Sequence, residues 1–192
     1  MKKFGFIFFI VLVSSKGSGL SNHSNNPKIS FAGQSLTMDT YCNARFGYCV
    51  DYPSKIAIPH PESENGDGRI FTNKKGEEIL RVWGRLSVKA PGDGFYSLKE
   101  QYQNDIHDII SQKGVITYRK FNKKYFVLSG YAYFETANNH KVWKAFYQKT
   151  FKKHHTFCYA VLQYDTHAQR MFNTLSNKVY TTFRLTNYWI TE

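Results

Sequence analysis

The sequence predicts an α+β fold in which helices pack on both faces of a central antiparallel sheet, as an α/β/α sandwich. Three observations lead to this class. The 192 residues include 14 Tyr and 16 Phe, and flat, half-buried rings suit pleated strands. Short turn segments separate the last four strand-like runs, and short joints can link only antiparallel neighbours. The run 125–134 is apolar or aromatic at both alternating sets of positions, which is typical of a strand covered on both faces.

The N-terminus has the layout of a secretory signal peptide. Lys2 and Lys3 precede an apolar run over residues 4–13, and two serines follow it. The run is too short to span a bilayer as a stable helix. We therefore interpret residues 1–19 as a signal peptide, with an N-terminal anchor or a buried helix as the alternative.

The remainder of the chain divides at about residue 38. Residues 20–38 are rich in Ser, Asn and Gly, and such a segment buries too little apolar surface to order itself. We expect a flexible tether there and a single domain over 39–192, because a domain typically has about 100–200 residues. The protein would then be periplasmic or secreted, with no stable transmembrane segment after the leader is removed.

Turn signals and periodicity place the elements of this domain. Ser97 with Glu100, and Thr166 with Gln169, form capping boxes that begin two helices. Gly114 stands where a left-handed residue ends the first helix. The sequence predicts strands over 46–52, 69–73, 78–86, 115–121, 124–134, 141–151 and 156–164, with helices over 97–113 and from 166 onward.

If the protein is exported, its cysteines can form a disulfide. Cys42, Cys49 and Cys158 are an odd number, so at most one internal disulfide can form. A tight hairpin with residues 45–46 at its tip would place Cys42 opposite Cys49, at a separation that a disulfide can close. This pair is a disulfide candidate, and two free thiols are the alternative. Cys158 lies in an apolar run, which indicates a buried thiol rather than a nucleophile.

The stretch 41–86 carries a family resemblance. It contains Asn43-x-Arg45-Phe46-Gly47-Tyr48-x-Val50-x-Tyr52-Pro53, then Asn65-Gly66-Asp67-Gly68-x-x-Phe71, then Leu80-x-Val82-x-Gly84. This pattern resembles the PsbP-like family, and within it the exported bacterial proteins of uncharacterised role. The resemblance implies an α/β/α sandwich, usually no catalysis, and an accessory or assembly role through binding other proteins. The motif residues are interpreted as fold markers, so no catalytic residue is transferred.

The connector 54–68 is long, braced by prolines and acidic on an otherwise basic protein. Long loops without regular structure are often functional, so this is either a recognition loop or a loop that wraps the sheet edge. The candidate partner-binding residues are His60, Glu62, Glu64, Asp67 and Arg69.

Three carboxylates of this connector could supply some of the oxygen ligands that calcium takes. Their spacing does not match a full EF-hand loop, which favours a turn with solvated acids and no cofactor. We assign no metal site. The sequence also lacks a Gly-x-Ser-x-Gly, a His-Glu-x-x-His, a Walker loop and a dinucleotide fingerprint, so we assign no catalytic residue.

The net charge limits the kinds of partner that the protein is expected to bind. The formal net charge is +12, and loss of the three lysines within 1–19 lowers it to +9. This indicates either a solvated basic surface or an anionic partner, such as an acidic protein or an anionic envelope surface. Export disfavours nucleic acid.

Three function hypotheses follow. The first is an exported, non-enzymatic binding or accessory protein of the cell envelope that acts by protein–protein contact, including an immunity-type inhibitor of a toxin. The second is an envelope hydrolase with a carboxylate and histidine site. The third is a carrier of a small apolar ligand, which would need a cavity between sheet and helix.

Overall fold

The computed structural model describes residues 29–31, 34–136 and 139–186, so the expected signal peptide lies outside the described residues. The strands are β1 (Ile29–Phe31), β2 (Gln34–Leu36), β3 (Met38–Asn43), β4 (Tyr48–Pro53), β5 (Ile58–Glu62), β6 (Gly68–Thr72), β7 (Glu78–Leu86), β8 (Val115–Phe121), β9 (Tyr125–Glu135), β10 (Lys141–Lys153), β11 (Thr156–Tyr164) and β12 (Arg184–Leu185). The helices are α1 (Leu98–Ser111), a 3-10 turn η1 (Thr166–Ala168) and α2 (Gln169–Thr182).

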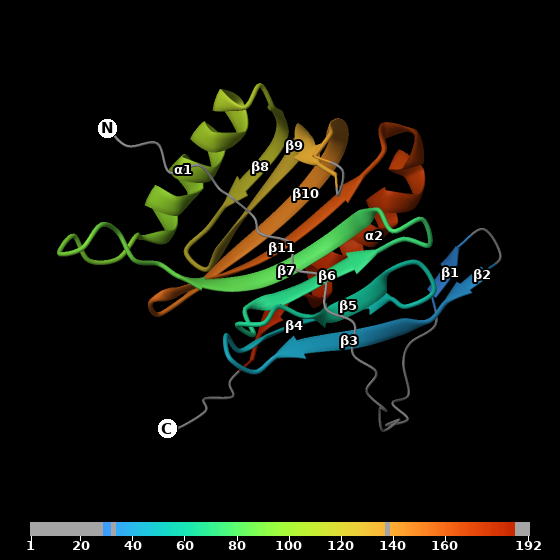
Figure 1. Ribbon diagram of the computed structural model, residues 1–192, viewed down its shortest axis with the longest axis horizontal. Coiled ribbons are helices and arrows are strands. Elements are labelled where there is room, and N and C mark those ends of the chain that lie inside the picture. Colours follow the sequence, from blue (N-terminus) through green and yellow to red (C-terminus); the bar gives the residue numbers. More distant parts are fainter. Residues whose placement is uncertain (1–28, 32–33, 137–138, 187–192) are drawn as a thin grey trace.

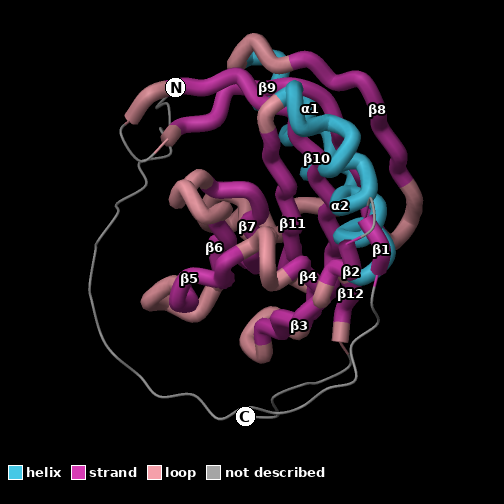
Figure 2. Tube along the Cα trace, turned by 90° about the vertical axis from the view of Figure 1, so that its right-hand side faces the viewer, coloured by secondary structure: helices cyan, strands magenta, loops and turns pink. Residues whose placement is uncertain are grey.

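Seven strands form one antiparallel sheet in the order β5-β6-β7-β11-β10-β9-β8. The strands β8, β9, β10 and β11 are consecutive in sequence and neighbours in the sheet, which confirms the predicted meander. The hairpin β6–β7 joins them through β11, which pairs with β7. Both views place β5 and β8 at opposite ends of this sheet (Figures 1 and 2).

The two helices pack on opposite faces of the sheet. On one face, α1 contributes Leu98 to a core that includes Phe126 and Phe146. On the other face, α2 contributes Phe172 and Val179 to a second core. The strand β9, next to the edge strand β8, is covered on both sides, because Phe126, Val127 and Leu128 are all fully buried although neighbouring side chains point to opposite faces. This confirms the double burial expected for this strand.

The α/β/α description gives more helix than the structure has. On the α2 face, part of the covering layer is a small sheet of order β12-β4-β3, of which Figure 1 labels β3 and β4. Tyr41, Tyr48 and Val50 of its hairpin are buried in the same core as α2. Large apolar side chains at alternating positions let a hairpin cover a sheet as effectively as a helix does. The fold is therefore α+β, mostly β-sheet with two α-helices.

The first helix begins as predicted and ends differently. Ser97 and Glu100 form the capping box, with Glu100 N donating to Ser97 Oγ at 3.1 Å and Ser97 N to the Glu100 carboxylate at 2.8 Å. The left-handed residue at the end is Lys113, with φ of 64°, so the assignment to Gly114 is wrong. Gly114 serves close packing instead, because a Cβ there would lie 2.7 Å from Ile109 Cγ2.

The predicted capping box of the second helix is also wrong. Residues 166–168 form a 3-10 turn, α2 starts at Gln169, and its N-cap Ala168 makes no side-chain hydrogen bond. Short 3-10 turns often begin α-helices.

β-Structure begins earlier than the expected domain boundary. Within the segment assigned to a tether, β1 pairs antiparallel with β2, and Met38 at the start of β3 is buried. Among the helices that the structure describes, none combines the length and the apolarity that a bilayer span requires.

Candidate functional site

The five partner-binding candidates gather at one edge of the large sheet. His60 and Glu62 belong to the edge strand β5, Arg69 belongs to β6, and Glu64 and Asp67 lie in the turn between these strands. This turn lies against the tip of the β3–β4 hairpin. We call the contact between residues 41–47 of the hairpin and residues 62–68 the latch.

Asn43 is the buried centre of the latch. Its side-chain amide donates to the Gly66 carbonyl at 2.8 Å and to Tyr41 Oη at 3.2 Å, and its Oδ1 accepts from Phe46 N at 2.8 Å. The bond to Gly66 joins the hairpin tip to the connector, and the other two hydrogen bonds hold the Asn43 side chain within the hairpin. Gly66 has φ of 66°, a conformation that suits glycine and shapes the turn that meets Asn43.

Arg45 holds the acidic end of the same turn. Its guanidinium forms an ion pair with Asp67 at 2.9 Å and donates to the Asn65 carbonyl. Asp67 also accepts from the Asn65 amide at 2.5 Å. Because Arg45 and Asp67 are partly exposed, the ion pair is screened by water, and it orients the turn more than it stabilises the fold.

Glu62 and Arg69 bind to Tyr41 from two sides. The Tyr41 hydroxyl donates to Glu62 Oε1 at 2.6 Å, and the Arg69 guanidinium lies 4.6 Å from the centre of the Tyr41 ring. Burial, reinforced by the hydrogen bond to Glu62, raises the pKa of the Tyr41 hydroxyl. The hydroxyl therefore stays protonated and donates at neutral pH.

The glycines of the motif permit close approach. A Cβ at Gly84 would lie 2.1 Å from Cγ of Phe46, whose ring fills that space. A Cβ at Gly68 would lie 2.1 Å from the Val82 carbonyl oxygen. Asp67 O then accepts from Gly84 N at 2.8 Å. The residues that carry the family resemblance therefore position the small hairpin on the large sheet, as expected of fold markers.

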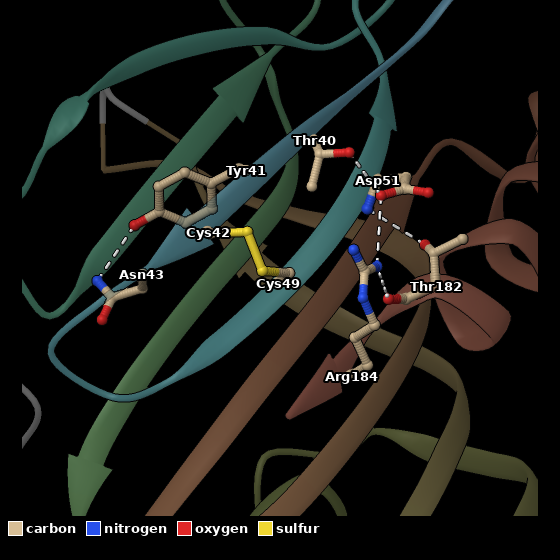
Figure 3. Close-up of a disulfide and its surroundings, with 8 residues drawn as sticks. All are labelled: Thr40, Tyr41, Cys42, Asn43, Cys49, Asp51, Thr182 and Arg184. Atoms are coloured by element: carbon tan, nitrogen blue, oxygen red, sulfur yellow. Dashed lines mark hydrogen bonds and ion pairs between the residues drawn. A yellow bond between two sulfur atoms is a disulfide. The ribbon is translucent and has the colours of Figure 1, made fainter. Parts of the chain in front are cut away.

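A disulfide closes the latch hairpin. Cys42 and Cys49 are opposed in the β3–β4 register and are bonded, with their Cα atoms 4.1 Å apart (Figure 3). On the far side of the bond, Asp51 accepts from Thr40 at 2.9 Å and lies 3.5 Å from Arg184 (Figure 3). The bond from Thr40 lies within the hairpin, and the contact with Arg184 ties the hairpin to β12.

Although they lie at one edge, the five candidate side chains do not converge on a single binding point. His60 Nε2 bonds to Thr72 Oγ1 at 3.0 Å, whereas Glu62 and Asp67 bond to Tyr41 and Arg45 respectively. The Glu64 side chain is exposed. Within the described ranges, no three His, Cys, Asp or Glu side chains gather in an arrangement that could hold a metal ion. The geometry thus uses most of these residues to hold the connector in place.

Sequence reasoning missed two charged groups with core partners, the half-buried Asp105 and the buried Lys149. Asp105 accepts from Gln101 at 2.5 Å and from Gln148 at 2.6 Å, and burial raises the pKa of its carboxyl to about 6. Lys149 donates to the carbonyls of Tyr180 and Phe183, at 2.5 and 2.9 Å.

Burial lowers the pKa of the Lys149 ammonium to about 8. A signal for both groups was present in the sequence. Asp105 stands three residues after Tyr102 on the apolar stripe of α1, and Lys149 alternates with Tyr147 and Phe151. A charge at a core position needs partners, and both groups have them.

The third cysteine is a buried thiol, in agreement with the sequence interpretation. Cys158 is fully buried, its Sγ lies 3.7 Å from the Phe46 carbonyl, and burial raises its pKa to about 12. A thiol with this pKa is a poor nucleophile at neutral pH.

A second surface lies at the opposite edge of the sheet. Four large apolar side chains of α1 and β8 are exposed there: Ile110, Val115, Tyr118 and Phe121. Beside them, a groove between α1 and β8 is lined by Ile106, Ile110, Ile116, Thr117, Tyr118 and Arg119.

Comparison with solved structures identifies the fold. The chain is similar to cyanobacterial PsbP (CyanoP) from Synechocystis sp. PCC 6803, with a TM-score of 0.50 and 12% identity, over 82% of this chain and 97% of that one. No family model matches the sequence, and no curated protein matches it. The protein therefore has a PsbP-like fold, as the motif over 41–86 predicts.

Proposed function

We propose that this protein is an exported, non-enzymatic accessory protein of the cell envelope that acts by binding another protein. The observation that carries the proposal is the apolar groove between α1 and β8, two of whose lining residues, Ile110 and Tyr118, are 59% and 51% exposed. Contiguous exposed apolar surface is typical of interaction sites. The candidate residues of the acidic connector instead hold the latch, so the proposal places binding at the α1–β8 edge.

Export is part of the proposal. The charged start and the short apolar run at the N-terminus support it, and the opposed cysteines suit an oxidising compartment. Cell fractionation with N-terminal sequencing tests this step. We expect a shortened chain outside the cytosol, and an intact N-terminus on cytosolic protein would contradict it.

Site-specific photocrosslinking in intact cells tests the binding role. A photoreactive residue at Val115 is expected to capture a defined envelope protein, whereas one at Lys75, in the exposed β6–β7 turn, serves as the matched control. The proposal would be contradicted if no exposed position gave a crosslink and the purified protein turned over a defined substrate.

A narrower form of the proposal is an immunity-type inhibitor. If the captured partner is an enzyme, its activity is measured with and without a stoichiometric amount of this protein. Inhibition at equimolar ratio supports this form, and unchanged activity restricts the function to an accessory role.

A further inference from the structure

The outer edge of β8 is open. In the sheet order β8 is the terminal strand, and in the described chain it pairs only with β9. A strand in this position presents a row of unpaired backbone N–H and C=O groups. Natural edge strands are protected by prolines, charged side chains, bulges or a covering element. β8 carries Arg119, Lys120 and a register shift between Ile116 and Tyr118, but it contains no proline and has six exposed residues among its seven.

The groove lies where a new strand would place its side chains. A strand added beside β8 would lie about 4.8 Å from it, with alternate side chains directed to each face of the sheet. On the α1 face, these side chains would meet Ile106 and Ile110 of the groove. A recurring mode of peptide recognition combines such main-chain pairing with pockets for alternate side chains.

The charged residues that flank this edge are mostly basic. Residues 109–134 contain the basic residues Lys113, Arg119, Lys120, Lys123 and Lys124 and no Asp or Glu. All five are exposed. The nearest acids along α1 are Asp105, which is bonded to Gln101 and Gln148, and Asp108 one turn before the helix end. An occupant with carboxylates would therefore be favoured over a basic one.

We propose that β8 receives an extended segment of a partner protein as an added strand, and that this segment alternates apolar and acidic residues. The proposal rests on the proposed binding function and names its site. The apolar residues of the segment contact Ile106 and Ile110 on the α1 face. Its carboxylates lie on the opposite face of the sheet, the face to which Lys120 points.

A second copy of this chain fits the edge less well. Pairing β8 with β8 would bring Arg119 and Lys120 of both copies into one interface. Pairing β8 with the acidic edge strand β5 of another copy meets Pro59 and Pro61, which lack the N–H groups that a ladder needs. A lipid surface would leave the backbone groups of the edge unpaired.

Selection from a displayed library of random twelve-residue peptides on the purified protein tests the proposal. We expect enrichment of sequences that alternate apolar and acidic residues. A synthetic copy of the best binder is then titrated by fluorescence polarisation. Ile110→Lys should weaken its binding at least tenfold, whereas the control Leu86→Lys, at a position with almost the same exposure (60% against 59%), should change it less than twofold.

Backbone methylation of the peptide separates strand addition from simple apolar contact. N-methylation at alternate residues should abolish binding in one register and leave it nearly unchanged in the other, because only alternate N–H groups of an added strand face β8.

Four outcomes would overturn the proposal: no peptide enriched above the Ile110→Lys variant, binding indifferent to methylation, dimerisation through β8, or binding to phosphatidylglycerol vesicles in place of peptides. A crosslinked partner that maps to another surface would also overturn it and leave the proposed function standing.

Discussion

The two edges of the large sheet solve the problem of an exposed strand in opposite ways. The β5 edge is acidic, carries two prolines and is held by the latch to the β3–β4 hairpin. The β8 edge is basic, lacks proline and exposes apolar side chains beside a groove. Because unpaired edges promote unwanted association, an edge left open beside a groove indicates a place for a partner, whereas a blunted edge indicates structure.

The largest expected effect is a difference in folding stability between a substitution in the latch and one at the β8 edge. Phe46 is buried against Gly84 in the latch, and Phe121 is partly exposed at the open edge. Phe46→Ala should lower the free energy of unfolding by about 3–5 kcal/mol because it leaves a cavity. Phe121→Ala should cost about 1 kcal/mol or less. Urea denaturation followed by fluorescence measures both, and equal costs would remove the distinction.

The disulfide gives the second largest effect. The bond closes a loop between residues seven apart in the sequence, for which the chain-entropy relation gives about 2.5 kcal/mol. The double variant Cys42→Ser, Cys49→Ser should lose about this much stability. Reducing agent should lower the stability of the native protein by a similar amount and leave the double variant unchanged. A native protein that is insensitive to reduction would contradict the prediction.

The third effect concerns the pH dependence of stability at Asp105, whose carboxyl contacts Gln148 and helps to hold α1 on the sheet. Burial raises the pKa of this carboxyl to about 6, above the usual value of 3.8. A raised carboxyl pKa favours the folded state at low pH, and this stability is lost as the pH rises from about 4 through 6.

Asp105→Asn should therefore raise the free energy of unfolding by about 1 kcal/mol at pH 7.5, and its advantage should vanish toward pH 4. The estimate is below the full linkage value because Asn accepts fewer of the bonds from Gln101 and Gln148. Denaturation midpoints across this pH range measure it. Asp105→Ala, which lacks both the charge and the acceptor, separates ionisation from hydrogen bonding.

The smallest effect on stability comes from the prolines of β5. Pro59→Val with Pro61→Val should change the free energy of unfolding by about 1 kcal/mol or less, since both positions are exposed. The restored N–H groups should nevertheless make the protein associate at high concentration. Sedimentation velocity measures this, and a variant that stays monomeric would show that the latch alone protects the edge.

The sequence located the segments of the candidate site but not the contacts between them. Turn dipeptides and acidity located the connector, and the motif located its partner hairpin, because both are local patterns. The contacts of Asn43 with Gly66 and of Glu62 with Tyr41 span about 20 residues, and no local pattern states which side chains meet. The α1–β8 groove escaped prediction for the same reason, since an edge strand and a central strand can share one alternation.

By itself, the sequence determined the antiparallel meander, the start of α1, the opposed cysteines and the PsbP-like character of the first half. Each follows from spacing along the chain, such as short joints, period-two alternation and a capping box. Only the tertiary structure decided that the first hairpin leaves the large sheet to share a layer with α2, and that the β5 edge carries the latch whereas the β8 edge lies beside the α1 groove. Which surface covers another depends on the shapes of large side chains packed across distant segments, and those shapes are realised only when the core forms.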